Sequence, residues 1–141
     1  MGNVTISKQF KFESAHCLPN HQGKCQRLHG HGYKVIVSIT GPIKKLTGES
    51  DEGMVVDFGI VSDIFKQRIE SVCDHQNLND VLPIKRTTAE ILSLWIFYEM
   101  EVGIQALSDT AHVSEVKVWE TDTSFAIATQ ESLDGDFWWR K

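Results

Sequence analysis

Two histidines and a cysteine in one short stretch are the residues of this sequence best suited to chemistry. The stretch runs from Cys25 to His31 and has the sequence CQRLHGH. On a β-strand, alternate side chains project from the same face, so His29 and His31 would converge on one side. His16, at the end of another alternating run, is a third candidate ligand. Three neutral imidazoles with an open fourth position would form a catalytic zinc site.

A closed, structural zinc site is the alternative interpretation of the same residues. Cys25 or Cys17 would then be a fourth ligand, and no position would remain open for a substrate. Cys17 directly follows His16, so on a strand it lies on the opposite face, and we discount it. A lone histidine is more often a packing or surface residue than a ligand. Three in register favour a metal, because buried imidazoles without partners cost free energy.

Two alternating runs are predicted to position these histidines. The first run, residues 4–16, has most of its apolar residues and His16 at even positions. The second, residues 29–39, has its apolar residues and both histidines at odd positions and stops at Gly41-Pro42. A period of two predicts strands, and the turn-rich loop between them predicts a long antiparallel pair. The three histidines would then lie together at the ends nearest the loop.

Two helices and two further strands are predicted to follow this pair. Asp57 can cap a helix that ends near residues 73–75, and a loop is expected over residues 77–83. Thr87 and Glu90 have the spacing of a capping box at the start of the second helix. The last strands are expected over residues 113–120 and 125–130. The order of two strands, two helices and two strands predicts an α+β fold with an antiparallel sheet.

The composition is that of a small globular protein. A chain of 141 residues has the length of one domain, so we expect residues 1–141 to form a single one. The net charge of −5 argues against a general binder of nucleic acid or of anionic membranes. Three cysteines do not suggest a disulfide framework, and neither a secretory signal nor a transmembrane run is apparent. We therefore expect a reducing, cytoplasmic location.

Several motifs resemble the 6-pyruvoyltetrahydropterin synthase family, and the resemblance extends from about Ile6 to Thr129. The motifs are Phe12–His16, Cys25–His31, Val56–Phe58, Asp74–His75, Thr87–Glu90 and Lys117–Glu120. The resemblance implies a tunnelling fold (T-fold) whose trimers pair into a hexamer, with active sites between subunits. The three residues between Cys25 and His29 resemble the 6-carboxy-5,6,7,8-tetrahydropterin synthase branch, which belongs to queuosine biosynthesis. The pyruvoyl branch typically has a longer gap, and the folate-pathway branch, with a glutamate in place of the cysteine, matches less well.

The resemblance also implies a role for each candidate site residue. Zinc (Zn²⁺) would bind His16, His29 and His31. The matching cysteine of the family is a general base, a role that the resemblance assigns to Cys25, working with Asp74 and His75. The pterin ring would be bound by Glu120, with help from Thr87 and Thr88.

The same residues have structural interpretations that stay open at this point. Cys25 could be a small buried residue. His75 could be a helix C-terminal histidine favoured by the helix dipole, beside a solvated Asp74. Glu120 could turn into solvent at a strand end, although it follows Val116 and Val118 at a period of two. Capping alone could explain Thr87.

The reaction implied by the resemblance converts 7,8-dihydroneopterin triphosphate to 6-carboxytetrahydropterin, with release of acetaldehyde and triphosphate. Two alternatives stay open: a pyruvoyl-type synthase that eliminates triphosphate, and a non-catalytic module that binds zinc or a pterin. Candidate cations for the triphosphate, each equally well explained as a surface charge, are Lys11, Lys24, Arg27 and Lys34. The aromatic stretch Phe137–Trp139 could cover an oligomer surface or pack on its own subunit.

Overall fold

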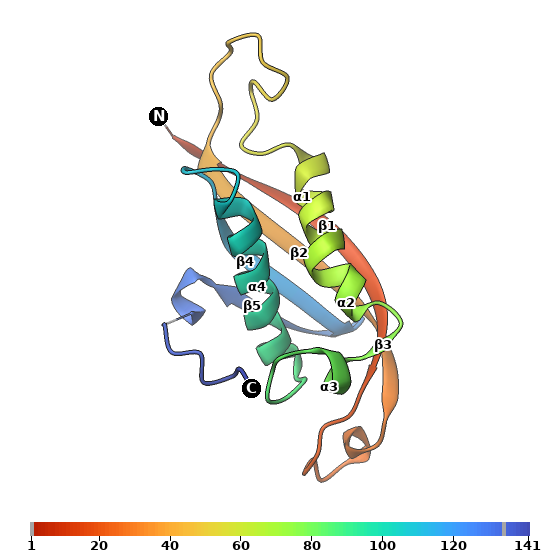
Figure 1. Ribbon diagram of the computed structural model, residues 1–141. Coiled ribbons are helices and arrows are strands. Elements are labelled where there is room, and N and C mark those ends of the chain that lie inside the picture. The colour runs from red at the N-terminus through yellow and green to blue at the C-terminus, as the bar shows by residue number, and fades with distance from the viewer. Residues whose placement is uncertain (1, 134) are drawn as a thin grey trace.

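The computed structural model describes residues 2–133 and 135–141 as a curved sheet with helices on one side (Figure 1). The regular elements follow one another as β1 (Asn3–His16), η1 (Lys24–Gln26), β2 (His29–Pro42), α1 (Phe58–Phe65), η2 (Lys66–Glu70), α2 (Ser71–Cys73), β3 (Gln76–Asn77), α3 (Leu78–Val81), α4 (Ala89–Gln105), β4 (His112–Thr121), β5 (Ser124–Thr129) and η3 (Gln130–Ser132). The predicted α+β class and the order of its long elements are confirmed.

The sheet has the strand order β3-β1-β2-β4-β5. β1 and β2 pair antiparallel along their whole length, from Asn3 opposite Pro42 to His16 opposite His29. β4 and β5 continue the antiparallel pairing, whereas the two-residue strand β3 runs parallel to β1. The register places His16 directly beside His29 at the end of the hairpin, as the alternating patterns predict.

The core lies between the sheet and the helices, which cover one of its faces (Figure 1). Alternate residues of β2 and β4, among them Val35, Val37 and Val118, are fully buried on that face. Gly103 allows α4 to approach α1 closely, because a Cβ atom there would lie 2.5 Å from Ile64 Cγ2. Burial of these apolar side chains is the main term that stabilises the layered packing.

The helix after Asp57 has the predicted start and end. The Asp57 carboxylate accepts a hydrogen bond from the Gly59 N–H at 2.7 Å, which is the geometry of an N-cap. The helical path passes from α1 through the π-helical turn η2 into α2 and ends at Cys73, with Asp74 as its C-cap. Asp74 and His75 therefore lie immediately beyond a helix end.

Two local predictions are wrong. The N-cap of α4 is Thr88, whose hydroxyl accepts from the Ile91 N–H, and not Thr87. Residues 77–83, expected to be a loop, include the end of β3 and the short helix α3, which Asn77 caps. A two-residue strand and a four-residue helix are too short to leave a periodic pattern.

None of the helices within residues 2–133 and 135–141 combines the length and the apolar character that crossing a bilayer requires.

Candidate active site

The three predicted histidines form one compact cluster at the loop end of the β1–β2 hairpin. One nitrogen from each of His16, His29 and His31 lies within 4.8 Å of the others. The ring centroid of His29 lies 4.6 Å from that of His16 and 4.7 Å from that of His31. Donor atoms this close can converge on a single ion, as they do in three-histidine metal sites.

Backbone carbonyls fix the tautomers of two of these imidazoles. His16 Nδ1 lies 2.9 Å from the Thr87 carbonyl oxygen, and His29 Nδ1 lies 2.7 Å from that of Arg27. A carbonyl oxygen only accepts hydrogen bonds, so Nδ1 carries the proton in both rings. Each Nε2 is left with a free lone pair, which is the form that binds a metal.

The chemistry of the cluster fits a metal and fits poorly with simple packing. The Nε2 atoms of all three histidines are buried without a hydrogen-bond partner among the described residues. Burial lowers the pKa of His16 and of His31, which keeps both imidazoles neutral. Buried, unpartnered nitrogen atoms cost free energy that a bound cation would recover. The residues present therefore fit a divalent metal ion.

Glu120 lies beside the cluster. Its Oε1 is 3.6 Å from His31 Nε2, and the side chain projects from β4 on the face that Val116 and Val118 also use. A hollow of about 580 Å³ adjoins it, lined by residues that include Thr88, Glu90, Glu120 and Phe125. A carboxylate at the rim of a hollow next to the histidine cluster is placed to bind a ligand with paired N–H donors.

The two threonines have different positions. Thr87 is buried, and its hydroxyl oxygen lies 3.1 Å from His16 Nδ1 and donates to the Cys17 carbonyl. Thr88 caps α4 and lines the hollow beside Glu120. The carbonyl groups of Thr87 and Arg27 are functional atoms that inspection of side chains misses, because every residue has such a group.

Asp74 and His75 form an ion-pair geometry just past the helix end, with His75 Nδ1 2.9 Å from Asp74 Oδ2. Asp74 Oδ1 accepts from the Glu13 N–H, and the His75 N–H donates to the Glu13 carbonyl. The Glu13 N–H and the His75 ring, in that order, lower the pKa of Asp74. His75 has a φ of 58°, an uncommon value outside glycine, and its side chain is 78% exposed.

The pair shares a second hollow with the edge of the sheet. That hollow, of about 520 Å³, is lined by residues that include Glu13, Gly30, Gly32 and His75. Glu13 and Gly32 occupy the strand positions opposite to those of the buried core residues. His75 thus opens toward the face of the sheet that the helices leave uncovered.

Cys25 lies in the short helix η1, in the loop between β1 and β2. In the described part of the chain its side chain makes no hydrogen bond or ion pair with Asp74 or His75, and it is outside the histidine cluster, as is Cys17. The structure therefore brings together the three histidines and Glu120. It does not bring Cys25, Asp74 and His75 together within one chain.

Of the four cations considered for the triphosphate, Lys34 has the clearest contact. Its ammonium nitrogen lies 4.4 Å from the centroid of the Trp119 ring, within cation–π range. Lys117 lies over the same ring at 4.8 Å. Both lysines project from the uncovered face of the sheet.

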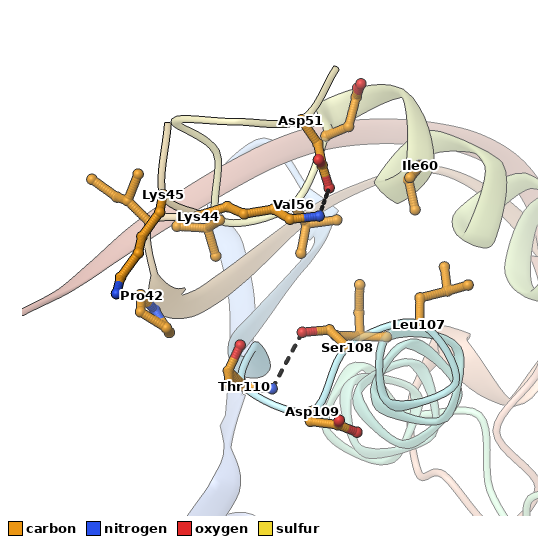
Figure 2. Close-up of a pocket in the computed structure, with 14 residues that line it drawn as sticks. Pro42, Lys44, Lys45, Asp51, Val56, Ile60, Leu107, Ser108, Asp109 and Thr110 are labelled. Carbon is orange, nitrogen blue, oxygen red and sulfur yellow. Dashed lines mark hydrogen bonds and ion pairs between the residues drawn. The ribbon is translucent and has the colours of Figure 1, made fainter. Parts of the chain in front are cut away.

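A different hollow, of about 440 Å³, lies at the other end of the β1–β2 hairpin (Figure 2). Lys44 Nζ bonds to Asp51 Oδ2 at 3.0 Å, and the Thr110 N–H donates to Ser108 Oγ (Figure 2). Glu49 and Asp51 raise the pKa of Lys44 by pairing with its ammonium group. None of the described residues that line this hollow is a histidine or a cysteine. The groups suited to chemistry therefore gather at the opposite end.

Comparison with known proteins identifies the family. The model of the 6-pyruvoyl tetrahydropterin synthase family matches residues 5–131. The chain belongs to this family.

Relatives within the family are similar over most of their length. A Synechocystis sp. protein named 6-carboxy-5,6,7,8-tetrahydropterin synthase is 40% identical over 122 residues, covering 86% of this chain and 89% of its own. A Haemophilus influenzae protein of the same name is 36% identical, covering 85% and 94%. The Caenorhabditis elegans 6-pyruvoyl tetrahydropterin synthase has the same fold, with a TM-score of 0.74, 20% identity and coverage of 92% and 96%. The chain is thus an enzyme of a tetrahydropterin synthase family, with the T-fold that the sequence predicts.

Proposed function

We propose that this chain is a 6-carboxy-5,6,7,8-tetrahydropterin synthase. It converts 7,8-dihydroneopterin triphosphate and one water molecule to 6-carboxytetrahydropterin, acetaldehyde and triphosphate, as a step of queuosine biosynthesis. The observation that supports this most is the cluster of three imidazoles with Glu120 Oε1 3.6 Å from one of them. A metal site beside a carboxylate suits a substrate with a ring that donates hydrogen bonds and a side chain that bears oxygen atoms.

The metal in this proposal is zinc, held by His16, His29 and His31. The Nδ1 contacts of His16 and His29 leave their Nε2 atoms for a metal, and three imidazole ligands leave an open coordination position. When bound, zinc supplies Lewis acidity, which acidifies the C–H and O–H bonds next to oxygen atoms that it binds.

Glu120 anchors the pterin ring in this proposal. A pterin presents a ring N–H and an exocyclic amine side by side, and a carboxylate accepts both in a bidentate arrangement. Thr88, in the same hollow as Glu120, adds a polar contact at the ring. Thr87 acts differently, because it is buried behind His16 and supports the metal ligand.

Cys25, Asp74 and His75 move the protons. Asp74 fixes the His75 ring through the 2.9 Å contact at Nδ1, and His75 Nε2 then exchanges a proton with substrate. Cys25, which lies between Lys24 and Gln26 in an exposed loop, takes a proton from the substrate side chain as a thiolate. Since one chain does not bring the three residues together, we propose that neighbouring subunits of a hexamer, a dimer of trimers, complete the site.

The pyruvoyl-type reaction is the second candidate, with the same fold and substrate. The three-residue gap between Cys25 and His29 and the identities of 36–40% to proteins named 6-carboxy-5,6,7,8-tetrahydropterin synthase favour the carboxy reaction.

The variant Cys25→Ala separates an enzyme from a non-catalytic binding module. If the chain is the proposed enzyme, this variant releases triphosphate from 7,8-dihydroneopterin triphosphate at a rate lower by on the order of 100-fold or more, because a general base is removed. It keeps one equivalent of zinc and the stability of the parent. Cys17→Ala is the matched control and should keep its turnover. Loss of zinc and of stability in Cys25→Ala would instead indicate a structural site with a cysteine ligand.

A further inference from the structure

The aromatic C-terminal segment packs on its own chain. Trp139 is 1% exposed and belongs to the hydrophobic core, whereas its neighbour Trp138 is 55% exposed. The Arg140 guanidinium carbon lies 4.7 Å from the Tyr98 ring centroid of α4 and 5.7 Å from that of Trp139. Of the two possibilities raised by the sequence, packing on its own subunit applies to Trp139.

This segment pairs with the connection between α3 and α4. The Lys85 N–H donates to the Trp139 carbonyl at 2.9 Å, and the Lys141 N–H donates to the Pro83 carbonyl at 3.1 Å. Ile84 and Arg140 face each other in an antiparallel bridge. The connection has no other strand pairing among the described residues, although the Arg86 side chain also donates to the Pro19 carbonyl.

The same connection holds a metal ligand. Thr87 lies two residues beyond Lys85, and its carbonyl accepts from His16 Nδ1. On the other side, the Asn79 side chain accepts from the Cys17 N–H at 2.9 Å and donates to the Cys17 carbonyl at 3.0 Å. The Lys141 ammonium group in turn donates to the Asn79 carbonyl at 3.3 Å. The His16–Cys17 segment is thus held by the Thr87 carbonyl and by the Asn79 side chain. Asn79 contacts the C-terminal segment, and Thr87 follows closely after the residues that pair with it.

We propose that Trp139 is a positioning residue for the metal site and acts on His16 through Thr87. Anchored by Trp139, the bridge at Ile84 fixes the backbone of the connection and so the place of the Thr87 carbonyl. That carbonyl sets the tautomer and the orientation of the His16 ring. Loss of a partner that orients a metal ligand typically weakens metal affinity by roughly 10–100-fold. The inference rests on the proposed function insofar as it takes the histidine cluster to be a metal site.

The test is metal binding by the variant Trp139→Ala in the full chain, without substrate. Co²⁺ replaces zinc as the probe: its visible absorption reports ligand geometry, and competition with a chelator gives the affinity. Two variants serve as controls. Trp138→Ala removes an exposed aromatic side chain from the same segment. Ile104→Ala removes a buried side chain at the end of α4 opposite to the connection and lowers stability as a core truncation does.

We expect Trp139→Ala to bind Co²⁺ roughly tenfold more weakly than the parent and with an altered spectrum, at a temperature where circular dichroism shows it folded. Trp139→Phe should restore much of the affinity. Trp138→Ala and Ile104→Ala should bind as the parent does. Parental affinity and spectrum in Trp139→Ala, or an equal loss in Ile104→Ala, would overturn the inference.

Deletion of Lys141 is the milder variant if Trp139→Ala fails to fold. It removes the bonds to Pro83 and Asn79 without opening a core cavity, and we expect several-fold weaker Co²⁺ binding. Unchanged binding would contradict the inference. A parent protein that binds no Co²⁺ or zinc at all would contradict the proposed metal site itself, so the two failures are distinguishable.

Discussion

The imidazole of His16 is ready for a metal before any metal binds. Its ring is buried, its Nδ1 proton is committed to the Thr87 carbonyl, and its Nε2 lone pair points into the cluster. His29 is prepared in the same way by Arg27. Since rotamer and tautomer are fixed by the fold, the affinity of the site does not have to include the cost of ordering these two side chains.

The burial of these rings predicts how the metal-free protein responds to pH. Burial lowers the pKa of His16 and of His31 from the usual 6.5, so the unfolded chain binds protons that the folded chain does not. The contribution of these two rings to the free energy of unfolding is complete above the pKa that histidine has in the unfolded chain. It is lost as the pH falls below that value. We therefore expect the free energy of unfolding to decrease between about pH 7.5 and about pH 5.5.

Urea denaturation of the metal-free protein at several pH values measures this dependence. The variant His31→Gln should show a shallower slope, because one of the two buried titrating groups is gone. Gln22→Ala, a change at an exposed residue of the loop that does not titrate, should keep the parental slope. A parental free energy of unfolding that is constant over this interval would contradict the burial of neutral imidazoles.

For individual residues, the sequence predicts which side chains converge but not which backbone groups orient them. The alternation through His29, Gly30 and His31 is sufficient to predict that the histidines converge. The same pattern says nothing of the Thr87 carbonyl, which reaches His16 across 71 positions of the chain. Backbone acceptors are present at every residue, so only tertiary structure selects the one that is used.

The beginning of α4 connects the hydrophobic core to the site. Thr88 caps the helix through its hydroxyl and lines the hollow beside Glu120, while the preceding Thr87 faces His16. Two adjacent threonines therefore have separate contacts, one that caps the helix and one that holds the His16 ring.

Thr88→Ala should lower the free energy of unfolding by about 1 kcal/mol, because the Ile91 N–H loses its capping partner. The change is measured by urea denaturation of the metal-free protein. Thr88→Ser, which retains a hydroxyl, should recover most of the loss, and Thr47→Ala, in the exposed loop after β2, should have no effect. Stability unchanged in Thr88→Ala, or not recovered in Thr88→Ser, would contradict this assignment of the cap.

Long helices and strands are predicted from the sequence, whereas very short ones are not. The long strands and helices have patterns of period 2 or 3.6 over many residues, and their order is right. The predicted N-cap of α4 is one residue too early because both Thr87 and Thr88 can cap a helix. Only the burial of Thr87 against His16 decides between them. The tail around Trp139 has no periodicity, so its pairing with the Pro83–Lys85 connection could not be foreseen.

At the scale of the whole molecule, the histidine cluster and the Asp74–His75 pair lie apart within one chain. The histidine cluster faces the helices, whereas His75 opens toward the uncovered face of the sheet, where Phe125 and Ile127 are also exposed. Our proposal of sites between subunits accounts for this separation, because the cysteine of one chain and the Asp74–His75 pair of another would meet at a boundary.

Complementation between two inactive variants tests this arrangement. Cys25→Ala and His75→Ala should each have little turnover alone. Unfolded together and refolded as a mixture, they should regain about a quarter of parental activity, the fraction of boundaries in a random assembly that contain both intact groups. Light scattering should show a particle of six chains. A mixture that stays as inactive as its components would place all three residues in one chain or give them another role.

The products formed from 7,8-dihydroneopterin triphosphate decide whether the chain catalyses the proposed carboxy reaction. The zinc-loaded protein is incubated with 7,8-dihydroneopterin triphosphate, and the products are identified by mass spectrometry. We expect 6-carboxytetrahydropterin together with acetaldehyde and triphosphate. A 6-pyruvoyl product would contradict the carboxy reaction while retaining the site, and unchanged substrate with the protein folded and zinc bound would contradict the enzyme altogether.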